Sequence, residues 1–152
     1  MAYWLMKTEP DAFAWQDLVR QGVATWDGVR NYSARNHMRT MKVGDLALFY
    51  HSNVGKEAVG IARIVREHYQ DPTTDDLRWS VVDVEPVVPL ERPVTLAAIK
   101  AEHAAGGALA NLCMIRENRL SVSPVTPAEW QHLLAMAATP DPDAGAAGKS
   151  SP

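Results

Sequence analysis

The chain has 152 residues and a mass of 16.7 kDa, which is the size of a single domain. Hydrophobic residues make up 47% and charged residues 22%, which excludes wholesale disorder, and no apolar run is long enough to cross a bilayer. The net charge of −3 argues against a protein that coats nucleic acid indiscriminately. The first residues show no secretory pattern, so we expect a cytoplasmic protein.

The first half of the chain alternates between strand and helix patterns. Pro10 ends an apolar aromatic run, while Asp11 and Asn31 stand where helix caps are favoured and Gly22 where a helix ends. The run before Ser52 is almost continuously apolar, which is typical of a strand buried on both faces. We predict strands over 3–7 and 46–51, helices over 11–20 and 32–41, and a short loop over 26–30.

The second half predicts more strands and a capped helix near its end. Thr126, Pro127 and Glu129 form a capping-box pattern, and Thr95 is suited to cap an earlier helix. We predict strands over 58–68, 79–85 and 120–123, helices over 95–104 and 126–138, a polar loop over 70–76 and a buried turn or short helix over 112–115. These elements predict an α+β fold, with a small, curved, mostly antiparallel sheet or barrel of five to six strands flanked by helices. We expect residues 1–138 to form one domain and residues 139–152 to form a disordered tail.

Signatures of enzymes and metal sites are scarce. The sequence has no Gly-rich phosphate loop, and its five histidines include no HxxxH pair. The single cysteine, Cys113, lies among apolar residues and is expected to be a buried hydrophobe. We therefore predict no catalytic residues, no metal and no cofactor.

Three aromatic residues lie where strand or helix periodicity does not require burial. Trp26 is in a polar loop, Trp79 follows an acidic loop, and Tyr50 ends a strand beside His51 and Ser52. We expect these edges to converge on a pocket, because indole faces stack on nucleobases. The segment 20–42 carries five basic residues against one acidic residue, which predicts a groove for an anionic ligand, or alternatively a solvated helix face.

Several runs of the sequence resemble the EVE domain family in the family's own order. The resemblance covers nearly the whole folded chain, and small departures are Thr8, where serine is usual, and Ser33, where glutamine is expected. The matching runs are 3–10, 26–36, 43–45, 49–53, 69–73 and 119–125. The resemblance implies a PUA-like fold related to YTH domains. It also implies a reader domain that flips a modified base, especially a modified cytosine in DNA or a modified base in RNA, into an aromatic pocket.

The resemblance also implies roles for individual residues. Trp26 is similar to the cage wall that follows the first helix in YTH relatives, and Lys7 and Thr8 match a pair that approaches backbone and base. The expected base-binding residues are Trp26, Tyr50, Trp79, Asn31, His51, Ser52, Lys7, Thr8, Asp71 and Pro72. The expected phosphate-binding residues are Arg30, Arg35, Arg39, Lys42 and Arg119. The expected partner is nucleic acid, with a separate effector protein required for any cutting.

Two other functions fit the same residues. The first is an RNA-processing or RNA-modifying enzyme that uses His51, Ser52 and Lys7 for acid–base chemistry. The second is a binder of a free nucleotide or a small aromatic ligand in the same pocket.

Overall fold

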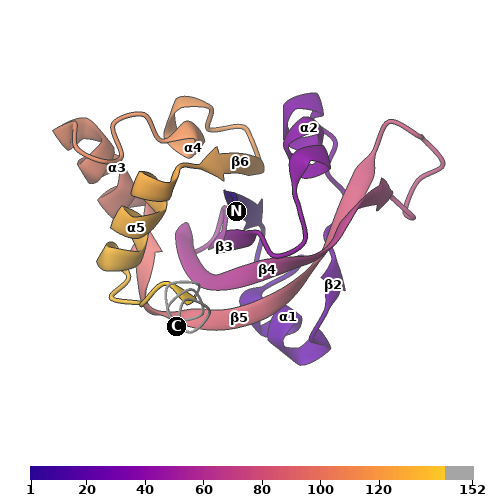
Figure 1. The fold of residues 1–152 in the computed structure, drawn as a ribbon, viewed down its shortest axis with the longest axis horizontal. Helices are drawn as coiled ribbons and strands as arrows, with labels where there is room; N and C mark the ends of the chain where they lie inside the picture. The colour runs from indigo at the N-terminus through magenta and orange to yellow at the C-terminus, as the bar shows by residue number, and fades with distance from the viewer. Residues whose placement is uncertain (143–152) are drawn as a thin grey trace, which may run out of the picture.

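The computed structural model describes residues 1–142 as a curved six-stranded sheet with helices packed around it (Figure 1). The strands are β1 (Tyr3–Thr8), β2 (Ala24–Thr25), β3 (Leu46–His51), β4 (Glu57–Gln70), β5 (Ser80–Thr95) and β6 (Val122–Val125). Their order is β2-β5-β4-β3-β1-β6, in which β1 pairs with β3 in parallel and the other neighbours are antiparallel. The predicted α+β fold with a mostly antiparallel sheet is confirmed.

Five helices complete the described part of the chain. They are α1 (Trp15–Gln21), α2 (Tyr32–Thr40), α3 (Leu96–Ala105), α4 (Cys113–Arg116) and α5 (Pro127–Met136). Figure 1 shows α3, α4 and α5 gathered at one side of the molecule, away from α1. None of the helices within residues 1–142 is long and apolar enough to cross a membrane.

The sheet separates two hydrophobic cores, because successive strand residues point to opposite faces. Phe49 packs in the core that includes residues of α1 and α2. Its neighbours Leu48 and Tyr50 pack in the second core, with residues of α3, α4 and α5. This alternation decides which side chains of β3 are able to share a pocket.

Local sequence signals placed most helix ends correctly. The Asn31 side chain accepts a hydrogen bond from the Ala34 backbone N–H at 3.0 Å, which confirms it as the N-cap of α2. Thr126 and Glu129 form the predicted capping box of α5. Gly22 ends α1 with a φ of 82°, a left-handed conformation that glycine adopts at little cost.

Two predicted elements need correction. Helix α1 begins at Trp15 rather than Asp11, because Ala12 and Phe13 donate backbone hydrogen bonds to the Glu9 carbonyl in a separate turn. Strand β5 continues ten residues beyond the predicted end at Glu85 and includes three prolines. The β4–β5 register shifts at several points, and such irregularities accommodate residues that lack a backbone N–H.

The folded region extends slightly beyond its predicted end. Thr139, which we expected to begin a disordered tail, is buried, and its hydroxyl accepts a hydrogen bond from the Glu91 backbone N–H at 2.8 Å. That prediction is therefore wrong at Thr139. Residues 143–152 of the expected tail lie outside the described residues.

Candidate nucleic-acid interface

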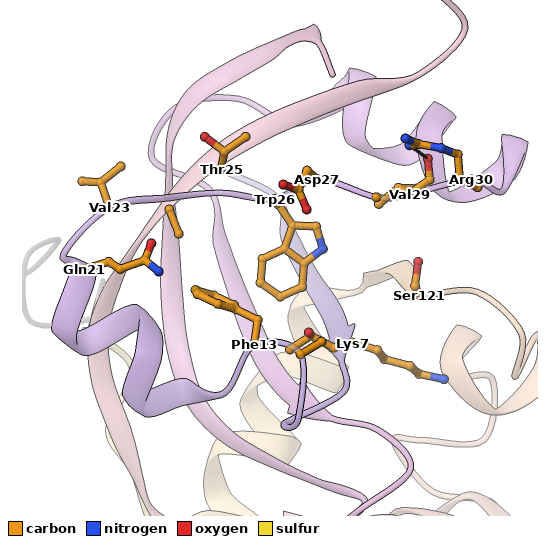
Figure 2. Close-up of a pocket in the computed structure, with 14 residues that line it drawn as sticks. Lys7, Phe13, Gln21, Val23, Thr25, Trp26, Asp27, Val29, Arg30 and Ser121 are labelled. Carbon is orange, nitrogen blue, oxygen red and sulfur yellow. Dashed lines mark hydrogen bonds between the residues drawn. The ribbon is translucent and has the colours of Figure 1, made fainter. Parts of the chain in front are cut away.

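A hollow of about 770 Å³ opens beside Trp26, between the end of β1 and the segment that joins β2 to α2. Figure 2 shows the indole at its centre, with the Phe13 ring on one side, the Lys7 side chain below and the Asp27 carboxylate beside it. Thr8, Arg30 and Ser121 also line it. An aromatic wall with a few polar groups around it is the usual composition of a ligand site.

The surrounding core holds the Trp26 ring in place. The ring is only 6% exposed and packs edge-on against Phe13 and Phe49, with ring centres 6.4 and 5.5 Å away. The indole is therefore largely buried, although its place in a polar loop did not require burial. The hollow beside it nevertheless leaves an indole surface next to open space, so Trp26 is both a core residue and a pocket wall.

Asp71 fixes the segment that carries Trp26. Its side chain is fully buried and accepts hydrogen bonds from the Gly28 backbone N–H at 3.2 Å and from Arg30 at 2.9 Å. Thr73 donates to the other carboxylate oxygen through its backbone and its hydroxyl, at 2.8 and 2.6 Å. Burial alone would raise the pKa of Asp71, but these hydrogen bonds outweigh it and hold the pKa at about 2.

Asp71 therefore supports the pocket without lining it. It was predicted as a base-binding residue, but its side chain accepts hydrogen bonds from this segment and from its own loop. Pro72, the next residue, is exposed and does not line the hollow.

The structure does not bring the three predicted aromatic residues together. Tyr50 lies on the opposite face of β3 from Phe49 and lines a different hollow, together with Ser52. Trp79 lines neither hollow and lies against Tyr32, with ring centres 5.2 Å apart. The expectation that Trp26, Tyr50 and Trp79 converge on one pocket is wrong, because the sheet separates Tyr50 from Trp26.

Two polar residues of the predicted base-binding set have structural contacts of their own. The His51 Nε2 atom accepts a hydrogen bond from the Trp15 backbone N–H at 3.1 Å, and burial lowers the pKa of this histidine. The Asn31 side-chain oxygen caps α2. Of the predicted base-binding residues, only Trp26, Lys7 and Thr8 line the Trp26 hollow.

Arginines of α2, of the segment before it and of the β4–β5 loop lie together beside the hollow. Arg35 and Arg39 both donate to the Arg78 carbonyl, at 3.2 and 3.1 Å, which ties the loop to the helix. Arg30 pairs with Asp71 and its side chain is 40% exposed, while Arg78 pairs with Asp76 and its side chain is 60% exposed. We call Arg30, Arg35, Arg39 and Arg78 the arginine surface.

Two predicted phosphate-binding residues lie outside this surface. The Lys42 ammonium lies 3.9 Å from Glu67. Arg119 is exposed in the segment between α4 and β6. Neither residue lines the Trp26 hollow.

Sequence reasoning missed three residues of the candidate site. Phe13 and Arg78 were not among the predicted binding residues, and Asp27 entered only as the one acidic residue of the segment 20–42. Asp27 is exposed and has no hydrogen-bond or ion-pair partner among residues 1–142. Its position directly after Trp26 is the one local signal that would have indicated it.

Two observations concern metal and thiol chemistry. The described residues contain no group of three or more histidine, cysteine or carboxylate side chains arranged to hold a metal ion. Cys113 is buried as expected, and burial together with its hydrogen bond to Glu117 raises the pKa of its thiol to about 11. A thiol with that pKa stays protonated at neutral pH and is a poor nucleophile.

Comparison with known proteins places this geometry in a family. The EVE domain family model matches residues 2–136. Human thymocyte nuclear protein 1 is 38% identical over 165 residues, which cover 89% of this chain and 73% of that protein. The structure of human THYN1 in complex with DNA containing 5-methylcytosine has a TM-score of 0.85 at 36% identity, covering 93% of this chain and all of that one.

A bacterial structure is also closely similar. The NMR structure of Rpa0253 from Rhodopseudomonas palustris has a TM-score of 0.83 at 47% identity, and the match covers 91% of this chain and 94% of that one. The family match extends from before β1 to the last residue of α5, so it includes the Trp26 hollow, the first hydrophobic core and all of the second core except Ala137. This chain belongs to the EVE domain family.

Proposed function

We propose that this EVE domain binds DNA that carries a modified cytosine and holds the extruded base in the Trp26 hollow. The observation that carries the proposal is the combination of an indole wall with an unpartnered carboxylate, Asp27, in a hollow of about 770 Å³. The human relative solved with 5-methylcytosine DNA supports the choice of ligand. DNA rather than RNA, and binding rather than catalysis, are parts of the same proposal.

Base recognition needs a stacking surface and a group that reads the base edge. Stacking on an aromatic ring contributes about 1–3 kcal/mol per base, which Trp26 supplies. The exocyclic amino group of cytosine is a hydrogen-bond donor, and a carboxylate is a suitable acceptor for it. Asp27 supplies that acceptor without giving up an existing contact, since it has no partner among the described residues.

The arginine surface is suited to hold the strand from which the base is extruded. Arginine forms directional hydrogen bonds with phosphate, and these contacts position a protein on nucleic acid without reading its sequence. Three or four phosphate contacts correspond to a slope of roughly −2.7 to −3.6 in a plot of log affinity against log salt. A binding affinity that does not change with salt would contradict docking through this surface.

The methyl group alone provides limited discrimination. Burying one methyl contributes about 0.8 kcal/mol, or roughly fourfold in affinity. Discrimination between bases is expected to be larger, because a base without a suitable donor would leave the Asp27 carboxylate unpaired in the hollow. We therefore expect a modest preference for 5-methylcytosine over cytosine and a stronger preference for cytosine over thymine.

The decisive experiment measures binding of labelled duplexes that differ at one position, carrying 5-methylcytosine, cytosine or thymine. Asp27→Ala is expected to weaken binding of the 5-methylcytosine duplex by about tenfold or more, since a hydrogen bond to a charged group contributes about 1.5–3 kcal/mol. Asp75→Ala is the matched control, because it removes the same charge from another exposed loop residue. Full affinity in Asp27→Ala would contradict the assignment, and a wild-type protein without a methyl preference would refute the function.

The stacking role of Trp26 requires a variant that folds. Removing a ring that is 6% exposed costs about 3–5 kcal/mol, so Trp26→Ala is expected to be strongly destabilised. Trp26→Leu keeps an apolar side chain there and removes the aromatic surface, and Trp79→Leu is its control outside the hollow. We expect loss of the modified-base preference in Trp26→Leu alone, with thermal melts confirming that both variants are folded.

A further inference from the structure

A second hollow, of about 250 Å³, lies on the opposite side of β3 from Trp26 and has three lysines in its lining. Lys7 comes from β1, Lys56 from the turn between β3 and β4, and Lys100 from α3. We call it the lysine hollow. Its floor is apolar and includes Tyr50, Leu96 and Met114.

Within residues 1–142, no salt bridge is formed by any of the three lysines. Among residues 1–142, none of them has a carboxylate oxygen within 4 Å, whereas Lys42 is paired with Glu67 at 3.9 Å. Lys7 donates to the Asn118 carbonyl at 3.3 Å, and the lining contains no carboxylate from the described part of the chain. Burial lowers the pKa of Lys7, because the charged ammonium is less stable where it is partly removed from water. An anionic ligand would supply that counter-charge.

The chain holds Lys56 in an unfavourable backbone conformation. Its φ is 48°, in the left-handed region that glycine or asparagine adopts more readily than lysine. The Lys56 carbonyl accepts a hydrogen bond from the Leu96 backbone N–H at 2.9 Å, which ties the turn to the start of α3. This contact keeps Lys56 and Lys100 on the same hollow.

We propose that the lysine hollow binds a phosphate group, and that in the DNA complex this is a phosphate of the strand whose base occupies the Trp26 hollow. The inference rests on the proposed function for the source of the phosphate. Lys7 lines both hollows, so the two meet at the end of β1, and one strand is able to reach both. Lysine binds phosphate as a compact charge, and the apolar floor is suited to the attached sugar.

The lysine hollow and the arginine surface then contact different phosphates. The arginine surface belongs to α2, the segment before it and the β4–β5 loop, whereas the lysines of the second hollow come from β1, the β3–β4 turn and α3. Contacts on both sides of the Trp26 hollow would fix the strand before and after the extruded nucleotide. Neither set reads the base, so both should affect methylated and unmethylated DNA equally.

The test is a salt titration of duplex binding by the full chain and the double variant Lys56→Asn/Lys100→Gln. Asparagine tolerates the left-handed conformation, so the variant is expected to stay folded. We expect weaker binding of methylated and unmethylated duplexes by the same factor, and a salt slope less negative by about 0.9 per phosphate lost. Lys100→Arg keeps the positive charge and should bind the duplexes more tightly than Lys100→Gln does. Arg92→Gln removes one positive charge away from this hollow and is the charge-matched control.

A second set of measurements tests whether the bound phosphate belongs to DNA or to a free nucleotide. Inorganic phosphate and deoxycytidine monophosphate are titrated into the wild type and the double variant by calorimetry. Lysine-dependent binding of these probes, with duplex affinity and salt slope unchanged, would support the site and assign it to a free nucleotide. Unchanged duplex binding together with no lysine-dependent binding of either probe would overturn the proposal. A wild-type protein that binds methylated and unmethylated duplexes equally would refute only the proposed function. The decrease in affinity caused by the lysine substitutions is measured on both duplexes and does not depend on the methyl preference.

Discussion

Replacing Asp71 by asparagine tests how the Trp26 segment is held in place. The buried carboxylate accepts hydrogen bonds on both oxygens, from Gly28 and Arg30 on one and from Thr73 on the other. An asparagine of nearly the same size has one oxygen and turns an N–H₂ group toward donors. Because hydrogen bonds to charged groups contribute about 1.5–3 kcal/mol, we expect Asp71→Asn to lower the free energy of unfolding by about 2 kcal/mol at pH 7.

The pH dependence of this loss gives a sharper test. The pKa of Asp71 is about 2 in the folded protein, against 3.8 for an aspartate in the unfolded chain. This difference corresponds to about 2 kcal/mol of stability. Since the folded pKa is depressed, the stabilisation is fully present above the unfolded pKa and is lost as pH falls through the folded pKa. By pH 3 about 1 kcal/mol of it should be gone.

Urea denaturation at pH 7, 5 and 3 measures this directly when wild type and Asp71→Asn are compared at each pH. Other carboxylates titrate in both proteins, so the difference between the two proteins isolates Asp71. We expect the stability gap to be constant from pH 7 to 5 and to narrow by about 1 kcal/mol at pH 3. A gap that stays the same at pH 3 would show that the Asp71 charge does not hold this segment.

Two further predictions concern packing and His51. A Cβ atom added at Gly60 would lie 2.5 Å from the Trp15 ring, so Gly60→Ala should lower the free energy of unfolding by about 1–3 kcal/mol. Gly107 has open space around it, so Gly107→Ala should change the free energy of unfolding little. Equal stability of the two variants in urea denaturation would contradict the Gly60–Trp15 contact. His51 accepts a hydrogen bond from Trp15 through Nε2 and has a lowered pKa, so its NMR titration midpoint should lie below 6.5. Stability should therefore decrease as pH falls below 6.5, because the unfolded chain binds the proton first, and a midpoint at or above 6.5 would be inconsistent with this hydrogen bond.

Much of the fold follows from local sequence patterns. The caps at Asn31, Thr95 and Thr126 depend on a side chain and a backbone N–H three residues later, so nearby residues suffice to predict them. Strand β3 runs from Leu46 to His51, the same bounds that its apolar run predicts. The continuation of β5 through Pro86, by contrast, depends on the register of its pairing with β4, which no local pattern contains.

The candidate site was only partly predictable. Trp26, Lys7 and Thr8 were expected beside the base and do line the hollow, while the base-binding roles themselves stay predictions. Tyr50 was misplaced because its face of the sheet depends on which residues of β3 meet α1 and which meet α5. Asp71 was expected to touch the ligand, and its partners Gly28 and Arg30 are more than forty residues away in the chain.

Short runs of residues and their spacing were enough to indicate the family, the caps of α2, α3 and α5 and most strands and helices, whereas the start of α1 and the short strand β2 were not predicted. Tertiary structure alone decided that Trp26 is packed edge-on in a core while bordering a hollow, and that Lys7, Lys56 and Lys100 surround a second one. The physical reason is that pockets form where segments distant in the chain meet. Their chemistry depends on which faces the sheet and helices turn toward each other, and local periodicity does not specify that meeting.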